Sequence, residues 1–134
     1  MAQLHIYIVD DDEVFAKSLK RLLQSTGYFT EVFSSAQSFL DSVPAYYKKG
    51  ILILDLRMPG MNGFQLQEKL KELRSDLEII FVTADAQPGD RDQAIEAGAI
   101  AFLQKPFQEQ TLFEMIDSAL SKLEGKETDR KIGE

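Results

Sequence analysis

Apolar residues in this chain form two alternating patterns, which are short unbroken runs and longer amphipathic stripes. The clearest run is Ile51 to Leu54, which follows Gly50 and ends at Asp55. A continuous apolar run of this length is typical of a strand that is buried on both faces of a parallel sheet. We therefore predict a central strand at residues 50–55 with a carboxylate at its end.

The same two patterns predict the remaining elements. Strands are expected where apolar and β-branched residues cluster, at 4–9, 31–33, 50–55, 78–83 and 101–104. Helices are expected where apolar residues recur every three or four positions, at 13–26, 36–43, 63–73, 88–97 and 108–124. Strict alternation of strand and helix predicts a parallel sheet covered by helices on both faces, because crossover connections are nearly always right-handed. Five such units fit an α/β fold of the flavodoxin-like type, a three-layer sandwich with strand order 2-1-3-4-5.

The ends of the helices set the expected domain boundary. Gly27, Pro44 and Gly98 follow apolar stripes and are expected to end helices, and the same is expected of Gly125. Residues 126–134 are polar. We therefore assign residues 1–124 to one domain and residues 125–134 to a polar C-terminal tail or the start of a linker.

Composition and charge exclude several classes of function. A length of 134 residues suits one domain with one core. The net charge of −7 argues against nucleic-acid binding by this chain, which would need a basic face. Cysteine is absent, so disulfides and thiolate metal sites are excluded. No run is long enough to span a bilayer and no signal-peptide pattern is visible, so we expect a cytoplasmic protein with no membrane contact.

Polar side chains stand at the predicted ends of the central strands. They are three successive acids at 10–12, then Asp55, Thr83 and Lys105. The fold would bring the end of the first strand beside the end of the third, so the carboxylates would crowd together. Two unit charges about 4 Å apart repel by about 4 kcal/mol at an effective dielectric constant near 20. Either Lys105 or a divalent cation must therefore offset the repulsion.

An all-oxygen site selects a hard cation such as Mg²⁺, or Mn²⁺, and leaves room for an anionic ligand. A phosphoryl group would suit it, with Lys105 neutralising its oxygens and Thr83 donating a hydrogen bond. Asp55 could then act as a nucleophile and form an aspartyl phosphate. Asp12 is either a third acid of this site or the N-cap of the first helix, and we favour the cap.

Four segments together resemble the receiver domain of two-component response regulators. They are Val9-Asp10-Asp11-Asp12, Leu54-Asp55-Leu56-Arg57-Met58-Pro59-Gly60, Thr83-Ala84 and Lys105-Pro106-Phe107. The resemblance covers about residues 4 to 123. It implies Asp55 as the phosphoacceptor, and Asp10 and Asp11 as the acidic pair for Mg²⁺, with the Arg57 backbone carbonyl as a further ligand.

The resemblance also implies roles in switching. Thr83 and Lys105 would bind the phosphoryl group, the Lys105–Pro106 bond would be cis, and Phe102 would be the switch aromatic. Many family members have Tyr at that position, so switching here would rest on packing alone. The alternative for Phe102 is a plain core residue.

Arg57 and Asp85 each lie two residues past a predicted site residue, and in receivers these positions flank the path of the attacking water. Because their charges are opposite, we expect them to pair over the acyl phosphate and slow its hydrolysis. The alternative is a pair of solvated side chains that contributes little.

The expected function is a phosphorylation-controlled switch. A histidine kinase or a histidine phosphotransfer protein would donate a phosphoryl group to Asp55, and the chain would catalyse only its own phosphorylation and dephosphorylation. The switching surface would comprise the elements at 88–97, 101–104 and 108–124, with Ile95 and Ile100 as candidate contacts. It would meet a partner, an attached transcriptional output domain, or a second copy in a phosphorylation-dependent homodimer.

Two segments, 57–61 and 96–107, most resemble receivers joined to LuxR-type DNA-binding domains. Two arrangements stay open: a receiver separated from such a domain near Gly125, and a stand-alone receiver. Competing functions are a Mg²⁺-dependent phosphatase of the haloacid dehalogenase type, for which Asp10 and Asp12 have the right spacing, and a flavodoxin-like electron carrier. The acids after the first strand would repel the phosphate of a flavin and disfavour the carrier.

Overall fold

The computed structural model describes residues 5–42 and 49–132, with side chains described as far as residue 125. The strands are β1 (His5–Val9), β2 (Phe29–Phe33), β3 (Gly50–Asp55), β4 (Leu77–Thr83) and β5 (Ala101–Gln104). The helices are α1 (Glu13–Ser25), α2 (Ala36–Ser42), α3 (Gly63–Glu72), α4 (Asp90–Glu96) and α5 (Glu109–Ile132). All paired strands are parallel, in the order β2-β1-β3-β4-β5. The predicted fold class and strand order are confirmed.

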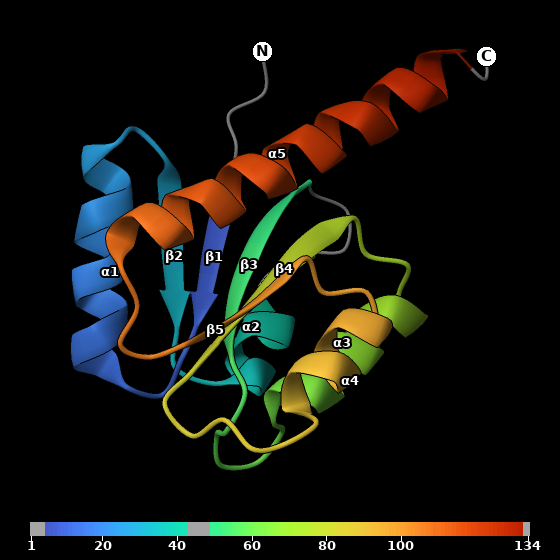
Figure 1. Cartoon of the computed structure of the whole chain (residues 1–134). Helices are drawn as coiled ribbons and strands as arrows, with labels where there is room; N and C mark the ends of the chain where they lie inside the picture. The colour runs from blue at the N-terminus through green and yellow to red at the C-terminus, as the bar shows by residue number, and fades with distance from the viewer. Residues whose placement is uncertain (1–4, 43–48, 133–134) are drawn as a thin grey trace.

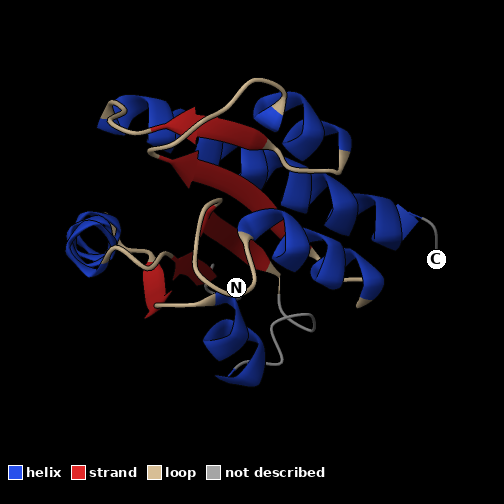
Figure 2. Ribbon diagram, turned by 90° about the horizontal axis from the view of Figure 1, so that it is seen from below, coloured by secondary structure: helices blue, strands red, loops and turns tan. Residues whose placement is uncertain are grey.

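The sheet lies between two helical layers. Helices α1 and α5 cover one face, and α2, α3 and α4 cover the other (Figures 1 and 2). Successive residues of each strand point to opposite faces, so Ile6 and Ile8 pack with α1 and α5, while Tyr7 and Val9 pack on the other side. The two cores explain why the central strands are apolar without interruption.

The register of the sheet brings the strand ends to one edge. Val9 is paired with Leu54, and Asp55 is paired with Val82. Figure 2 views the molecule from the end to which the strands β1 and β2 point in Figure 1, which is the carboxyl edge of the sheet. Residues that follow β1, β3, β4 and β5 therefore meet at this edge.

Helix starts follow local capping. The Asp12 side chain accepts a hydrogen bond from the Phe15 N–H and caps α1, as favoured from the sequence. Ser35 accepts from the Ser38 N–H at the start of α2. Helix α4 begins at Asp90 and not at Pro88, because Gly89 adopts a φ of 87° before the first helical turn.

The predicted end of α5 is wrong. Gly27 and Gly98 adopt φ values of 95° and 108° and follow the ends of their helices. Gly125 keeps helical backbone, and α5 continues to Ile132, beyond the end of the sheet in Figure 1. A glycine weakens a helix by about 1 kcal/mol relative to alanine but ends it only where the backbone leaves the helical region. The division at residues 124 and 125 stays a prediction.

Smaller differences concern single positions. Strand β2 begins at Phe29, two residues earlier than expected from 31–33. Leu66 and Leu70 of α3 are buried as expected, but Leu73 follows the helix and is exposed. The predicted helix end at Pro44 lies outside the described residues. Among the residues described, no helix combines the length and the apolar character needed to cross a membrane.

Candidate functional site

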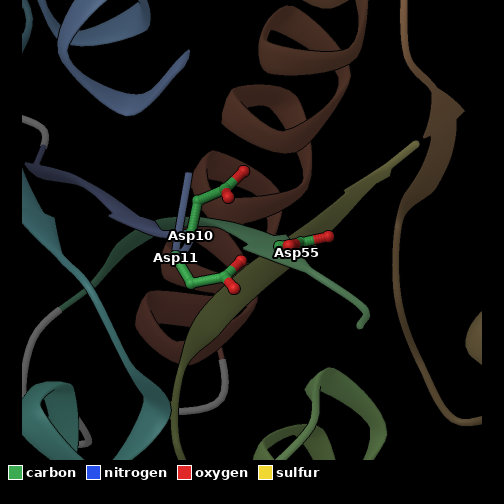
Figure 3. A group of neighbouring side chains, drawn as sticks. All are labelled: Asp10, Asp11 and Asp55. Carbon is green, nitrogen blue, oxygen red and sulfur yellow. The ribbon is translucent and has the colours of Figure 1, made fainter. Parts of the chain in front are cut away.

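Three carboxylates converge at the carboxyl edge of the sheet. Asp10 and Asp11 follow β1, and Asp55 ends β3. One carboxylate oxygen of each lies within 4.8 Å of the others, and Figure 3 shows Asp10 and Asp11 projecting toward the side on which Asp55 lies. Asp10 and Asp55 are buried, whereas Asp11 is exposed. Two of the three acids are therefore shielded from water, and Asp11 reaches solvent.

Lys105 offsets part of this negative charge. Its Nζ lies 2.7 Å from Asp10 Oδ2, and the other oxygen, Oδ1, accepts from the Asp12 N–H at 2.9 Å. The Lys105 side chain is only 14% exposed, so the pair is shielded from water. The sequence left open whether Lys105 or a divalent cation offsets the carboxylate repulsion, and the structure shows the Lys105 ammonium paired with Asp10.

Among the described residues no basic side chain forms an ion pair with Asp55, and its pKa is raised from 3.8 to about 7. Burial is the main cause, and repulsion from Asp10 adds to it, while the positive charge of Lys105 lowers the pKa. A hydrogen bond and charge from Asp11 also raise it. Burial and the neighbouring acids thus favour the protonated form of Asp55 below about pH 7, and an added positive charge would favour the ionised form.

Thr83 ends β4 next to Asp55. Its side chain is buried and its Oγ1 accepts from the Asp85 N–H at 3.2 Å. Its carbonyl accepts from the Lys105 N–H at 2.8 Å, which ties the ends of β4 and β5 together. The Lys105–Pro106 bond is cis, as the family resemblance implied.

Phe102 lies half-buried on β5. Its ring centroid is 6.3 Å from that of Phe81, with the planes inclined at 41°. On the same side of the molecule Ile95 of α4 is 41% exposed, whereas Ile100 packs against the core under α1 and α5. Of the two predicted surface contacts, Ile95 alone is an exposed one.

Arg57 pairs with a different acid from the one predicted. Among the described residues, its ion pair is with Asp90, where Nη2 lies 2.6 Å from Oδ2. The same oxygen accepts from the Gln87 N–H at 2.9 Å, and the Asp90 side chain is 10% exposed. Asp85 is exposed and is not the partner of Arg57 here, so the expected pairing of these two residues over an acyl phosphate stays a prediction. Separate effects of Arg57 and Asp85 on hydrolysis stay a prediction.

Two residues of the site were missed from the sequence, Asp90 and Phe15. Asp90 lies 33 residues after Arg57 and meets it only because α4 starts there. An acid in the first turn of a helix was the available signal, but it has the simpler reading of a favourable charge at the helix start. Phe15 belongs to the apolar stripe of α1, and its ring lies against the Lys105 ammonium.

The donor atoms fit a hard divalent cation. Three carboxylate oxygens within 4.8 Å of one another, with no nitrogen or sulfur donor among them, match the preference of Mg²⁺ or Mn²⁺. Burial and then the negative charge of Asp10 raise the pKa of Asp55, and a bound cation would favour its ionised form.

Comparisons with known proteins agree with this geometry. Residues 6–117 match the family described as "Response regulator receiver domain". The chain is 38% identical over 120 residues to the transcriptional regulatory protein FixJ of Bradyrhizobium diazoefficiens. This alignment covers 90% of this chain and 58% of FixJ. It is 44% identical over 115 residues to the response regulator protein TmoT of Ectopseudomonas mendocina, covering 86% of this chain and 52% of TmoT. The chain spans about half the length of these relatives.

Solved structures give the same result. The response regulator StyR superposes with a TM-score of 0.89 at 37% identity, over 98% of this chain and 66% of that one. The crystal structure of FixJ-N superposes with a TM-score of 0.80 at 34% identity, over 89% of this chain and 94% of that one.

Proposed function

This chain belongs to the response regulator receiver domain family, and we propose that it accepts a phosphoryl group on Asp55 in a two-component phosphorelay. The donor would be a histidine kinase or a histidine phosphotransfer protein. The observation that carries the proposal is the meeting of three carboxylates within 4.8 Å at the edge where Lys105 also lies. A cytoplasmic location is part of the same proposal.

The transfer would be a displacement at phosphorus. An Asp55 carboxylate oxygen attacks the phosphorus of phosphohistidine, an O–P bond forms, and the P–N bond breaks with its electron pair returning to the imidazole. Lys105, now bonded to Asp10, would turn its ammonium toward the new phosphoryl oxygens, and the Thr83 hydroxyl would donate to another.

Asp10, Asp11, Asp55 and the Arg57 carbonyl would hold Mg²⁺ or Mn²⁺. When bound, the cation would offset repulsion among the carboxylates and neutralise phosphoryl oxygens. The protein would supply the buried walls of the site, since Asp10 and Asp55 are 1% and 6% exposed. Burial strengthens every charge interaction that these residues make.

Phosphorylation would add a charge of about −1.5 to −2 at Asp55. Movement of Thr83 toward this charge would open space beside Phe102, whose ring lacks a hydroxyl and would respond through packing against Phe81. The surface of α4, β5 and α5 would thereby switch between two populated states. Its target would be a partner, a second copy, or an attached output domain that controls transcription, as the names of the relatives suggest.

We propose no turnover of an external substrate beyond the chain's own phosphorylation and dephosphorylation. A phosphatase of the haloacid dehalogenase type would need Asp12 as its second acid. Asp12 instead caps α1 through the Phe15 N–H, which weighs against that reading. Turnover of p-nitrophenyl phosphate that Asp10→Asn abolishes and Asp55→Asn spares would favour the phosphatase.

Intact mass spectrometry tests the proposal directly. After treatment with acetyl phosphate and Mg²⁺, we expect one added phosphoryl group, which is lost in Asp55→Asn and when the cation is removed with EDTA. Modification of Asp55→Asn to the same extent as the unmodified sequence would contradict Asp55 as the acceptor.

A further inference from the structure

We propose that Phe15 is a positioning residue, whose ring holds the Lys105 ammonium on the side of the site where Asp10 and Asp55 lie. The inference rests on the proposed function, because it concerns the residue that would bind the phosphoryl group.

The ammonium of Lys105 has two neighbours of different kinds. Its Nζ lies 3.9 Å from the centroid of the Phe15 ring and 2.7 Å from Asp10 Oδ2. A cation over the face of an aromatic ring is attracted by the negative charge density of that face, most strongly where water is excluded. With 14% of the Lys105 side chain exposed, this site is largely shielded from water.

Phe15 is itself held in place from two sides. Its N–H donates to the Asp12 side chain at 3.1 Å, which fixes the first turn of α1. Its ring meets Phe107 edge to face, with centroids 6.1 Å apart and planes at 82°. Phe107 follows Lys105 by two residues, so the segment that carries the lysine also supports the ring beneath it. The ring therefore has a fixed position against which the flexible Lys105 side chain packs.

A fixed ring position lowers the entropy cost of binding, because a lysine side chain is long and loses much rotamer freedom when it binds a ligand. The Phe15 face and the Asp10 carboxylate together restrict the ammonium before any phosphoryl group arrives. Only a short movement from Asp10 to a phosphoryl oxygen then remains. Preorganisation of this kind speeds a reaction when the group acts more strongly on the transition state than on the ground state.

The simpler role for Phe15 is packing alone. The ring borders an apolar cavity of about 510 Å³ between α1 and the segment that follows β5, together with Leu19, Leu22, Pro106 and Phe107. A packing role predicts that any apolar side chain of similar size serves equally well. A positioning role requires an aromatic face at residue 15.

Nuclear magnetic resonance on the unphosphorylated protein distinguishes the two roles. The ring current of Phe15 should shift the Lys105 ε-proton signals upfield. We expect Phe15→Leu to abolish this shift, Phe15→Tyr to keep it, and Leu22→Ala, about two turns along the same helix, to leave it intact. The absence of an upfield shift in the unmodified sequence would overturn the proposal whether or not Asp55 is phosphorylated.

Phosphorylation rates provide the second measurement. With acetyl phosphate, the Asp55 O–P bond forms and acetate leaves. At saturating Mg²⁺, we expect Phe15→Leu to react about three- to tenfold more slowly, the size of a partly shielded cation–aromatic contact. Its half-saturating Mg²⁺ concentration should be unchanged. Phe15→Tyr and Leu22→Ala should react like the unmodified sequence.

Failure of this inference can be separated from failure of the proposed function. If Lys105→Met slows phosphorylation of Asp55 while Phe15→Leu does not, the function stands and the role of Phe15 is wrong. If Phe15→Tyr and Leu22→Ala slow the reaction as much as Phe15→Leu, packing explains all three and the inference is also wrong. If the unmodified sequence gains no phosphoryl group on Asp55, the proposed function fails.

Discussion

Asp55 occupies a position where burial and neighbouring charge both oppose its ionisation. Its pKa rises from 3.8 to about 7, chiefly because it is buried and then because Asp10 is negative. A nucleophilic carboxylate must be ionised. Ionisation of Asp55 lowers the stability of the folded chain, and it also favours binding of a cation at the site.

Replacing Asp55 with Asn should therefore stabilise the folded state in a pH-dependent way. The folded-state pKa is raised, so in the absence of a cation the unmodified sequence loses stability as pH rises from about 4 to about 7, while Asn does not ionise. The advantage of Asp55→Asn should be absent below about pH 4 and greatest above pH 7, at most about 4 kcal/mol from 1.36 kcal/mol per pKa unit. Urea denaturation in EDTA at several pH values measures it.

Saturating Mg²⁺ provides the control for this experiment. The cation would offset the charge of ionised Asp55, so the advantage of Asn at high pH should shrink. An advantage that is constant with pH, or that grows as pH falls, would show that Asp55 ionises normally in the folded chain.

The residues of the site differ in how far the sequence could predict them. Asp10, Asp11, Asp55, Thr83 and Lys105 follow directly from strand ends, because a parallel sheet brings those ends to one edge. The partner of Arg57 could not be predicted in this way. Asp85 and Asp90 both lie in the segment after β4 and could each pair with Arg57. Asp90 is the partner because Gly89, in the left-handed region, sets the start of α4 at Asp90.

At the scale of elements, Asp90 links the loop after β3 to the start of α4. Its Oδ2 accepts from Arg57 at 2.6 Å and from the Gln87 N–H at 2.9 Å. The carbonyl of Arg57 is a proposed cation ligand. The ion pair between Arg57 and Asp90 therefore links the first turn of α4 to the proposed cation site. A buried carboxylate with two donors costs more to remove than an exposed one.

A double-mutant cycle on Arg57→Ala and Asp90→Ala measures this link. We expect a coupling of about 0.5–3 kcal/mol in the free energy of unfolding, because the side chains are in contact. The matched cycle with Asp85→Ala should give a coupling within about 0.5 kcal/mol of zero. The reverse order of the two couplings would mean that Arg57 pairs with Asp85 in solution.

Gly63 and Gly125 differ in the space available for a side chain, so an alanine at each should change stability in opposite directions. A Cβ at Gly63 would lie 2.6 Å from the Asp55 carbonyl oxygen and 2.8 Å from Phe81 Cε1, both in a closely packed part of the core. We expect Gly63→Ala to destabilise the fold by about 1–3 kcal/mol and to disturb Asp55. Thermal or urea unfolding measures the change.

Gly125→Ala is the matched variant, because a Cβ there meets nothing within 4 Å. Since α5 continues through residue 125, alanine should raise stability by about 0.5–1 kcal/mol and increase the helical circular dichroism signal. A destabilised Gly125→Ala would mean that the helix ends at Gly125 in solution, as the sequence first indicated.

Element boundaries were harder to predict than element types. The central strands β1, β3 and β4 contain apolar patterns typical of a sheet covered on both faces, so their positions followed from the sequence, whereas β2 at the sheet edge begins at Phe29 and not at Glu31. The start of α4, which follows the left-handed Gly89, and the end of α5 did not follow from the sequence, because glycine marks a helix boundary only where φ becomes positive. Gly98 does so and Gly125 does not, and nothing in the residue type distinguishes them.

At the scale of the whole molecule, one sheet connects the site to a distant surface. Thr83 and Lys105 lie at the ends of β4 and β5, and the Lys105 N–H is bonded to the Thr83 carbonyl at 2.8 Å. We therefore expect a shift of either residue to affect β5, the strand that carries Phe102. The topology was predictable from alternation of elements, whereas the response of the surface depends on packing that the sequence does not specify.

The exposed Ile95 on α4 makes this response testable as assembly. If phosphorylation switches the α4–β5–α5 surface to a form that binds a second copy, light scattering should show a dimer after treatment with acetyl phosphate and Mg²⁺. Ile95→Glu should abolish the dimer without reducing phosphorylation, because a charge buried at an interface is costly. Val14→Glu is the matched control, since Val14 is an exposed apolar residue on α1, which packs on the other face of the sheet. A dimer that survives Ile95→Glu but not Val14→Glu would place the interface on α1.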